Sequence, residues 1–355
     1  MEYLRLKDVC DINMGQSPTS DSYNDAGDGV PFFQGNADFG DRYPITRKWC
    51  NAPTKMAQPG DILISVRAPI GAINYAKEEC CIGRGLAAVT PDRDKVSPDF
   101  VFWFLKGKKE ELNSKGTGST FKAISRKVLE EILVPNVDLK EQSKYAEILE
   151  KIYFVQKSQK QELKYLDDLI KARFVEMFGS IHESTKYPYI AVKDLTDVIS
   201  GGTPSRDRSE YWYNGTIPWV KTTELQNNVI KNVDEYITES GLADSSAKMV
   251  PIGTVLVAMY GQGKTRGMTA YLGIEASTNQ ACACILPSEK IDSMYMWKYF
   301  ELSYDKLRSL AQGAGQPNLN GNMIKNFQVL VPPIELQNEY VSFVNQIDKS
   351  KFSFS

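Results

Sequence analysis

The chain has 355 residues, of which 42% are hydrophobic and 24% are charged. This length indicates two or three domains, and this composition excludes a disordered, collagen-like or membrane-spanning protein. The 42 basic and 44 acidic side chains nearly cancel. That balance excludes a uniformly basic nucleic-acid-binding protein, so any contact with nucleic acid must come from local patches.

The start of the chain mixes acidic and basic residues without an apolar core, so we do not interpret it as a secretory signal. No apolar run reaches the ~20 residues that a membrane helix needs, and we expect no membrane partner. The six cysteines lack C-x-x-C spacing, which favours reduced, buried thiols in a cytoplasmic protein. His182 is the only histidine, which argues against histidine-based catalysis and against a metal site of the zinc type.

Six short motifs occur twice in the same order, at offsets that drift from 186 to 197 residues. The pairs are Lys7-Asp8-Val9 with Lys193-Asp194-Leu195, Gly15-Gln16-Ser17-Pro18-Thr19 with Gly201-Gly202-Thr203-Pro204-Ser205, Val30-Pro31-Phe32-Phe33 with Ile217-Pro218-Trp219-Val220, Pro59-Gly60-Asp61-Ile62-Leu63-Ile64 with Ile252-Gly253-Thr254-Val255-Leu256-Val257, Gly116-Thr117-Gly118 with Gly313-Ala314-Gly315, and Leu133-Val134-Pro135 with Leu330-Val331-Pro332. Six matches in register predict two homologous domains, 1–138 and 180–333, with insertions in the loops of the second.

Each domain is predicted to be mixed α/β with long polar loops. The first has predicted strands at 62–66, 86–90 and 131–134 and a helix at 99–112. The second has their counterparts at 255–259, 281–286 and 327–331, with a helix at 293–310. The aromatic residues of both helices are best explained as core.

Residues 139–178 contain no proline or glycine and are rich in helix-forming residues, so they predict one long helix that ends at Gly179. Forty residues would extend ~60 Å. A helix lying on a domain surface is the alternative, but the length and the charge on two sides favour a coiled-coil spacer, 139–179. Its apolar stripe with heptad-like spacing includes Leu149, Ile152, Leu163, Leu166 and Ile170. A second such helix, 334–355, begins in the same way and includes Val344 and Ile347.

The sequence offers no convincing catalytic motif. The segment 258–265 approximates a phosphate-binding loop, but a glycine-broken stretch follows it where a helix is required, so a basic loop at a strand end is favoured. Val331-Pro332-Pro333-Ile334 lacks the polar and aromatic ends of an adenine methyltransferase motif. Asp92 and Asp99 have no partner that would make a metal-dependent nuclease. We therefore predict no catalytic residue.

Three acid-free windows, 112–129, 245–274 and 306–334, combine cations with small polar or amide residues. Cations contact phosphates, and amide or hydroxyl groups can contact base edges, although the amide-rich segment 313–322 is equally well explained as a solvated turn. With the polar residues of the repeated motifs, the candidate DNA-binding residues are Gln16, Ser17, Thr19, Arg67, Arg84, Lys115, Lys122, Arg126, Thr203, Ser205, Arg206, Lys221, Lys264, Arg266, Gln316, Asn318, Asn320 and Asn322.

The duplicated plan resembles the DNA sequence-specificity (S) subunit of type I restriction–modification systems. The strongest matches are Val134-Pro135 with Gln142, and Val331-Pro332-Pro333 with Gln337, each leading into a long helix. The resemblance implies two target recognition domains, one for each half of a split DNA sequence, and spacer helices that pair antiparallel. It also implies that two modification subunits methylate adenine with S-adenosylmethionine and that restriction subunits use ATP and Mg²⁺. The S subunit would then bind double-stranded DNA and hold no cofactor itself.

The chain departs from this plan in its last helix, 334–355, which is short and appears as a truncated copy. Antiparallel pairing would place it over 163–178 and leave the stripe around Leu149, Ile152 and Val155 without a partner. Exposed apolar stripes recruit partners. We expect self-association, a separate fragment or a modification subunit there.

Two alternatives belong to other classes of function. A fused restriction–modification enzyme or nuclease would methylate or cut DNA by itself. A duplicated-domain scaffold, or a DNA-binding protein without a restriction–modification role, would not direct modification subunits to a sequence. Sequence-dependent protection of duplex DNA with modification subunits present distinguishes these from a specificity subunit.

Overall fold

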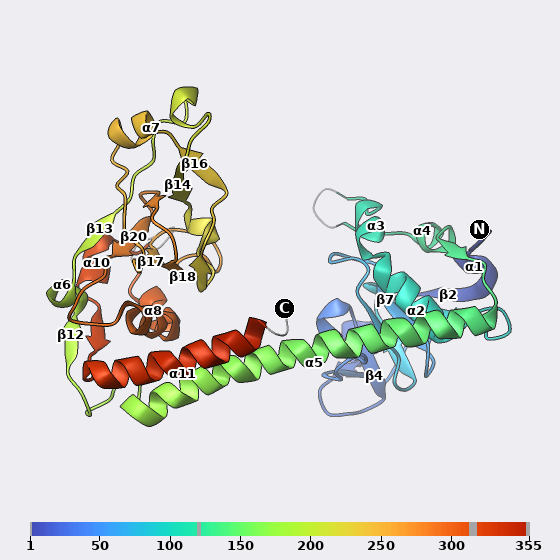
Figure 1. Cartoon of the computed structure of the whole chain (residues 1–355). Helices are drawn as coiled ribbons and strands as arrows, with labels where there is room; N and C mark the ends of the chain where they lie inside the picture. Colours follow the sequence, from blue (N-terminus) through green and yellow to red (C-terminus); the bar gives the residue numbers. More distant parts are fainter. Residues whose placement is uncertain (1, 119–121, 312–317, 353–355) are drawn as a thin grey trace. The chain divides into compact units, whose positions relative to one another are not determined.

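The structure, a computed structural model, describes residues 2–118, 122–311 and 318–352 (Figure 1). The chain divides into two compact units, residues 1–158 (unit 1) and 159–355 (unit 2). Their boundary falls inside one long helix, so the predicted domain division at 138, 179 and 333 stays a prediction. Within the described ranges, no helix combines the length and the apolar character needed to cross a lipid bilayer.

The described residues of unit 1 form three sheets. The main sheet has the antiparallel order β2-β10-β7-β8, a second has the order β3-β5-β4-β9-β6 with β4 and β9 parallel, and β1 pairs with β11. The strands are β1 Tyr3–Arg5, β2 Cys10–Met14, β3 Tyr23–Asn24, β4 Val30–Phe33, β5 Trp49–Cys50, β6 Met56–Ala57, β7 Ile62–Ser65, β8 Ile73–Tyr75, β9 Cys80–Ile82, β10 Leu86–Pro91 and β11 Leu133–Pro135. The α-helices are α1 Leu6–Val9, α2 Pro98–Gly107, α3 Lys109–Ser114 and α4 Arg126–Glu130.

The described residues of unit 2 repeat the core of this topology, with a strand added to the edge of the main sheet and a smaller second sheet. Its main sheet has the order β13-β20-β17-β18-β15, β14 and β19 pair in parallel within the sheet β16-β14-β19, and β12 pairs with β21. The strands are β12 Tyr189–Ala191, β13 Val198–Ser200, β14 Ile217–Val220, β15 Asn228–Ile230, β16 Glu235–Ile237, β17 Val255–Ala258, β18 Thr269–Leu272, β19 Ser277–Thr278, β20 Cys282–Ile285 and β21 Gln328–Leu330. The α-helices after the linker are α6 Val192–Leu195, α7 Glu239–Ala243, α8 Ser293–Leu302, α9 Tyr304–Ser309, α10 Gly321–Lys325 and α11 Ile334–Phe352. The predicted duplication of a mixed α/β domain is confirmed.

Two predicted helices are wrong in their extent. The segments 99–112 and 293–310 each form two helices, because the chain turns at Lys108 and at Ser303. Lys108 N–H donates to the carbonyl of Leu105, three residues back, which closes α2. The turn returns the chain to the core, where Leu112 and Leu307 are buried. A helix continued through the turn would carry these side chains away from the core.

One predicted strand also begins too early. Residues 131–134 were expected to be extended, but β11 starts at Leu133. The N–H of Ile132 donates to the carbonyl of Leu129, so Glu131 and Ile132 still belong to the turn that closes α4.

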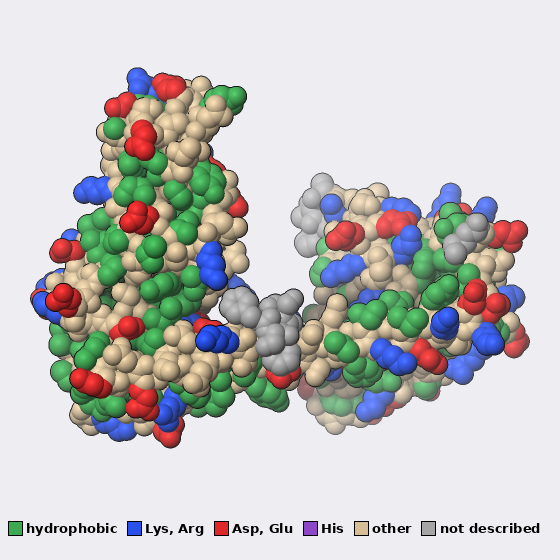
Figure 2. Space-filling model, viewed as in Figure 1, with side chains coloured by type: hydrophobic (Ala, Val, Ile, Leu, Met, Phe, Trp, Pro, Cys, Tyr) green, Lys and Arg blue, Asp and Glu red, His purple; other side chains and the backbone are tan. Residues whose placement is uncertain are grey.

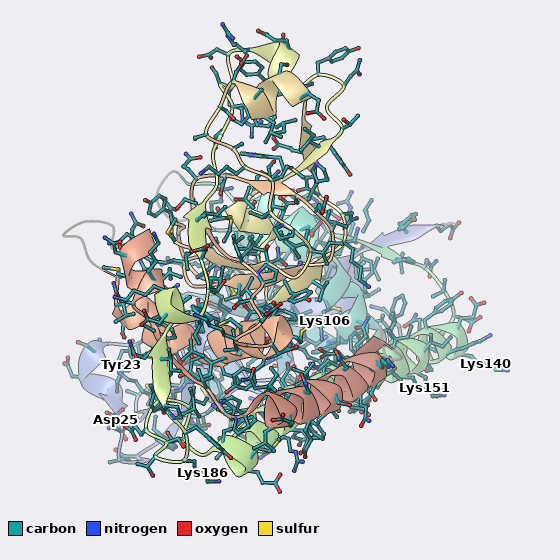
Figure 3. All side chains as sticks on the ribbon, turned by 60° about the vertical axis from the view of Figure 1, so that its left-hand side comes forward. Tyr23, Asp25, Lys106, Lys140, Lys151 and Lys186 are labelled. Atoms are coloured by element: carbon teal, nitrogen blue, oxygen red, sulfur yellow. The ribbon has the colours of Figure 1, made fainter. Side chains whose placement is uncertain are left out.

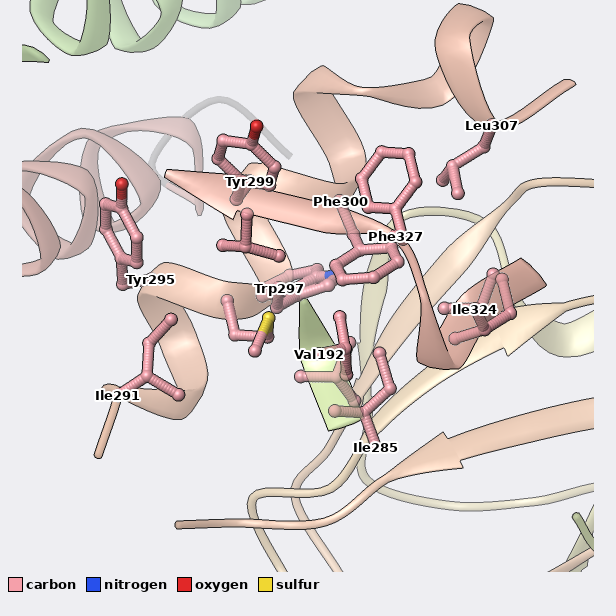
Figure 4. Packing of buried hydrophobic residues seen from close by; sticks show 14 of the residues in the cluster. Val192, Ile285, Ile291, Tyr295, Trp297, Tyr299, Phe300, Leu307, Ile324 and Phe327 are labelled. Atoms are coloured by element: carbon pink, nitrogen blue, oxygen red, sulfur yellow. The ribbon is translucent and has the colours of Figure 1, made fainter. Parts of the chain in front are cut away.

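The aromatic residues of α2 and α8 are core residues, as the sequence predicts. In unit 1, Phe102 is 1% exposed and stacks on Tyr75 with ring centroids 4.3 Å apart. In unit 2, Tyr299 and Phe300 from α8 pack with Phe327 (Figure 4). The helices that carry these side chains pack against the main sheet of their unit.

Helix α5 runs from Leu139 to Phe178, and Gly179, with a φ of 85°, ends it in the left-handed region that glycine adopts without strain. Within unit 2, α11 lies alongside the second part of α5 (Figure 1). Arg173 pairs with Glu339 at 2.7 Å, and Asp167 pairs with Lys351 at 2.7 Å, so the two helices are antiparallel. This confirms the predicted pairing over 163–178.

The predicted stripe divides between the units accordingly. Ile170 and Val344 are buried in unit 2, and Leu163, Leu166 and Ile347 are half-buried. In unit 1, Leu149 is 40% exposed and Ile152 is 47% exposed.

A buried glutamine attaches each long helix to its unit. In unit 1, the Gln142 side-chain oxygen accepts from the N–H of Ser97 at 2.7 Å, and its amide donates to the carbonyl of Val137 at 2.8 Å. In unit 2, Gln337 accepts from the N–H of Asp292 at 2.9 Å and donates to the carbonyl of Pro332 at 2.7 Å. Each amide therefore joins the start of a long helix to the start of α2 or α8.

Replacing Gln142 by leucine should lower the stability of the protein. The substitution leaves the N–H of the half-buried Ser97 without its acceptor, at a cost of about 1–3 kcal/mol. Urea unfolding followed by circular dichroism should show a lower midpoint for Gln142→Leu. Gln156→Leu is the control, because Gln156 is exposed on the same helix and its replacement should change the free energy of unfolding by less than about 0.5 kcal/mol. Equal midpoints for the two variants would contradict the anchoring role.

Candidate nucleic-acid interface

The loops that carry most of the candidate residues of unit 1 meet at one end of its main sheet. Strand β10 is antiparallel to both β2 and β7. The C-terminal ends of β2 and β7 therefore lie beside the N-terminal end of β10, where Ala87 is paired with Met14 and Leu86 with Ser65. The segments that follow Met14 and Ser65, and the segment that precedes Leu86, emerge together.

Hydrogen bonds join these segments. Ser17 Oγ accepts from the N–H of Arg84 at 3.3 Å, and the carbonyl of Gly85 accepts from the N–H of Val66 at 2.9 Å. Arg67, which follows Val66, forms a β-bridge with Ala123, and Lys122 directly precedes Ala123. Four segments that are distant in sequence thus bring Ser17, Arg84, Arg67 and Lys122 to one surface.

Arg84 lies in a turn with a fixed backbone. A Cβ atom on Gly85 would lie 2.4 Å from the carbonyl oxygen of Gln34, so only glycine allows this close approach. The side chains of Arg67, Arg84 and Lys122 are exposed, and none makes an ion pair with another residue in the described ranges. Three cations on one rigid surface are suited to contact an anionic ligand.

The same end of the sheet in unit 2 has the same construction. The N–H of Gly202 donates to the carbonyl of Thr278 at 2.8 Å, and Thr203 Oγ1 donates to the side-chain oxygen of Gln280. Gln280 occupies the position of Arg84, because the residues that follow the two make the same backbone hydrogen bond. The carbonyl of Ala281 accepts from the N–H of Met259 at 2.8 Å, as the carbonyl of Gly85 accepts from the N–H of Val66. Gln280 is exposed.

Gln280 was absent from the candidates predicted from the sequence. It lies at an offset of 196 residues from Arg84, within the range of the repeat, and this offset is the signal that could have identified it. Arginine and glutamine at one structural position can each form two hydrogen bonds with a base, arginine with guanine and glutamine with adenine.

The basic loop between β17 and β18 contains Lys264 and Arg266. The carbonyl of Lys264 accepts from the Tyr304 hydroxyl at 2.8 Å, and the carbonyl of Arg266 accepts from Arg308 Nη1 at 2.8 Å. Strand β18 begins at Thr269, so a strand follows where a phosphate-binding loop requires a helix. The segment is therefore a loop between two strands, as the sequence favours.

The described asparagines of the amide-rich segment 313–322, which were expected to contact bases or to form a solvated turn, have different surroundings. Asn320 caps α10, because its Oδ1 accepts from the N–H of Met323 at 3.0 Å, so this oxygen already has a structural partner. Asn322 is exposed in α10, and the N–H of Leu319, beside Asn318, donates to the carbonyl of Met259 at 3.0 Å. The Oδ1 of Asn318 is buried and accepts no hydrogen bond within the described part of the chain. Gln316 lies outside the described residues.

Arg206 and Lys221 belong to a cluster around Glu235. The Arg206 guanidinium lies 3.6 Å from the Trp212 ring centroid and 2.6 Å from Glu235, and Lys221 Nζ lies 3.0 Å from Glu235. Burial acts to raise the pKa of Glu235, but the hydrogen bonds from Arg206 and Lys221 outweigh it and lower the pKa. Both cations are therefore oriented by a carboxylate, and a role for either in binding DNA stays a prediction.

The remaining candidates are exposed. Thr19 and Ser205 are the last residues of one pair of repeated motifs, Lys115 pairs with Glu111 at 2.6 Å, and Arg126 pairs with Glu130 at 2.7 Å. Pairs of this kind on an exposed surface contribute little and exchange readily for a phosphate partner.

Reactive groups are few in the described part of the chain. All six cysteines are free and buried, as predicted, and burial raises the pKa of Cys10 and of Cys80 to about 12. Such thiols are protonated at neutral pH and are poor nucleophiles. No group of three or more His, Cys, Asp or Glu residues is placed to hold a metal ion within these ranges.

The family model for the type I restriction modification DNA specificity domain matches residues 1–172 and 184–354. The chain belongs to this family. It is 48% identical over 141 residues to a Methanocaldococcus jannaschii protein named as the type I restriction enzyme MjaX specificity subunit, a match that covers 40% of this chain and 33% of that protein. The chain thus spans about a third of that relative.

Two further relatives extend over nearly the whole chain. The MjaIX specificity subunit of the same organism is 21% identical over 371 aligned positions, which cover 97% of this chain and 85% of the relative. The crystal structure of the S subunit of a type I restriction–modification system from M. genitalium superposes with a TM-score of 0.61 at 13% identity, covering 99% of this chain and 90% of that one. This second likeness shows a shared fold.

Replacing Glu235 by glutamine should destabilise unit 2 in a pH-dependent way. A carboxyl group whose pKa is lowered on folding contributes stability above its unfolded pKa, and that contribution is lost as the pH falls through the folded value. The urea midpoint of Glu235→Gln should therefore be lower than that of the wild type at pH 7, and the difference should shrink as the pH falls below the unfolded pKa of about 4.3 and through the lower folded value. A difference that is the same at pH 7 and pH 3 would contradict the ionic character of the cluster.

Proposed function

We propose that the chain is the non-catalytic specificity subunit of a type I restriction–modification system, which recognises a bipartite DNA sequence with one half-site for each unit. Family membership and the duplication of one fold support this proposal. The single observation that carries it is that both units gather exposed cationic, amide and hydroxyl side chains at the same end of the same sheet.

The chemistry would belong to other subunits. Methyltransferase subunits would bind S-adenosylmethionine, restriction subunits would bind ATP and Mg²⁺, and the chain would direct both to the recognised sequence in the cytoplasm. Helix α5, which contributes to both units, would set the gap between the half-sites. Half-sites contacted by linked domains must have a spacing set by the geometry of the duplex.

The two half-sites should be recognised independently. Selection from random duplexes, with the chain bound to its methyltransferase subunits, should yield two conserved half-sites separated by a constant gap. Arg84→Ala should relax the preference at one half-site and Gln280→Ala at the other, each by roughly 5–150-fold in affinity, the value of ~1–3 kcal/mol for a bidentate base contact. A selected sequence with one continuous site, or two variants that relax the same half-site, would contradict the proposal.

The cations should contribute through phosphates. Lys122→Ala should weaken binding to all sequences alike and reduce the slope of log K against log salt by about 1. Lys77→Ala is the matched control, because Lys77 follows β8 at the opposite end of the sheet, where Tyr75 is paired with Ile62. The salt slope of Lys77→Ala should equal that of the wild type, and equal losses for the two variants would place the interface elsewhere.

A further inference from the structure

One segment of unit 1, residues 34–42 (the connector), joins the candidate interface to the long helix α5. At its first end, the carbonyl of Gln34 accepts from the N–H of Gly85 at 3.1 Å, directly after Arg84. The connector then folds back, because Asp38 Oδ2 accepts from the N–H of Gln34 at 2.8 Å. The first end of the connector is therefore held against the turn that carries Arg84.

The later part of the connector is fixed to the main sheet of unit 1. The N–H of Gly40 donates to Asn74 Oδ1 at 3.1 Å, and Asn74 Nδ2 donates to the carbonyl of Gly40 at 3.2 Å. The carbonyl of Arg42 accepts from the N–H of Tyr75 at 2.9 Å. Asn74 is 1% exposed, and a buried amide that is bonded on both sides leaves the backbone little freedom. The connector is thus a rigid part of unit 1.

The second end of the connector contacts α5 through Arg42. Arg42 Nη1 lies 2.7 Å from Glu150 Oε2, and the same carboxylate oxygen accepts from the indole N–H of Trp103 at 3.2 Å. The Arg42 guanidinium also lies 4.7 Å from the Phe102 ring centroid. The side chain of Arg42 is only 23% exposed, so salt screens this ion pair less than a pair on the open surface.

A second ionic contact lies further along α5. Asp41 accepts hydrogen bonds from the Tyr153 hydroxyl and from Lys157 Nζ, and these bonds lower the pKa of Asp41, the bond from Lys157 most of all. Figure 2 shows acidic and basic side chains interspersed over the visible face of unit 1, so an exposed ion pair is ordinary there. The Asp41 contact differs because it attaches a long helix to a segment that is itself fixed to the sheet.

The corresponding segment of unit 2 begins in the same way and ends without charge. The carbonyl of Val220 accepts from the N–H of Asn279 at 3.0 Å, and Glu224 Oε2 accepts from the N–H of Lys221 at 2.7 Å. The segment continues into residues 226–228, which are glutamine and two asparagines. These residues carry no charge that could pair with a helix, so the ionic attachment in unit 1 is not a general feature of the fold.

Two attachments fix the direction of a helix, whereas one allows it to tilt. Gln142 and Lys157 lie ~22 Å apart along α5, at ~1.5 Å per residue. Over the ~54 Å from Gln142 to Phe178, a tilt of about 4° would displace the far end by ~3.8 Å. This displacement is close to the rise of one base pair, ~3.4 Å. A small change in the direction of α5 is therefore enough to change the gap that it sets.

We propose that Asp41 and Arg42 are positioning residues that determine how strictly the gap between the two half-sites is recognised. They fix the direction of α5 relative to the turn that carries Arg84, and they act through the helix without contacting DNA. The proposal rests on the proposed function, because it requires that α5 sets a gap. It goes further by assigning the recognition of gap length to two residues of the connector.

Duplexes that differ only in gap length test the proposal. They carry both selected half-sites at the selected gap, or at a gap one base pair shorter or longer, and binding is measured with the methyltransferase subunits present. Arg42→Met should reduce the discrimination between gaps by about 2–30-fold, the range for residues that couple two sites. The base preferences within each half-site should stay those of the wild type, which a general loss of structure would not allow.

Exchange of charges identifies the contact responsible. Asp41→Lys should reduce the discrimination between gaps by about 2–5-fold, the range for an exposed ion pair, and the added change Lys157→Asp should restore it. Lys151→Met is the control, because Lys151 is exposed on α5 and forms no ion pair with a residue of the described ranges (Figure 3). It should discriminate between gaps as the wild type does. Asp41 and Lys157 are about half exposed, so all of these variants should keep the melting temperature of the wild type.

The outcomes separate this proposal from the proposed function. A wild type that selects a constant gap, with Arg42→Met and Asp41→Lys equally strict, would overturn the role of the connector and leave the proposed function intact. A charge exchange that fails to restore discrimination would also overturn that role. A wild type that selects no pair of half-sites at a constant gap would contradict the proposed function and the role of the connector together.

Discussion

The arrangement of both units depends on one interaction, the side-chain amide of a buried glutamine at the start of a long helix. Gln142 is 3% exposed and Gln337 is 1% exposed, and each joins backbone groups of the helix start to the N-terminus of α2 or α8. A buried amide is stable only when its donors and acceptors are satisfied, so this arrangement allows little variation in how the helix leaves its unit. Because the interaction occurs twice, both helices leave in the same way, and Tyr145 and Tyr340 reach equivalent places.

A second constraint, the antiparallel pairing of the main sheets, decides where functional side chains can gather. The ends of β2 and β7 in unit 1, and of β13 and β17 in unit 2, lie beside the starts of β10 and β20. The loops at these ends differ between the units. Residues 66–72 of unit 1 contain a cis bond between Ala68 and Pro69, whereas residues 259–268 of unit 2 contain three glycines with positive φ. One scaffold with different loops is suited to recognise two different half-sites.

The sequence predicted the features that repeat or that are local. The duplication follows from six motifs in order, the long helix follows from 40 residues without proline or glycine, and the antiparallel pairing of α11 over 163–178 follows from the family resemblance. Segments rich in polar residues also indicated which loops carry the candidate interface. These features depend on residues close together in the chain, or on a comparison of the chain with itself.

Other features depend on contacts between distant residues and could not be predicted in this way. The turn at Ser303 follows the burial of Leu307 and has no glycine or proline beside it, whereas Gly107 directly precedes the turn at Lys108 and was a local signal for it. The contact of Thr203 with Gln280 joins residues 77 positions apart, and the Arg206–Glu235 pair joins residues 29 positions apart. The attachment of Asp41 and Arg42 to α5 joins residues 112 and 108 positions apart.

Hydrogen–deuterium exchange tests most directly whether the two units bind DNA through the same end of the same sheet. It is measured on the chain in complex with methyltransferase subunits, with and without DNA. The account predicts slower exchange on DNA binding in the segments 83–86 and 279–282, with unchanged exchange around Lys77 and Lys290 at the opposite ends. Protection in one unit alone, or protection at the opposite end of either sheet, would contradict it.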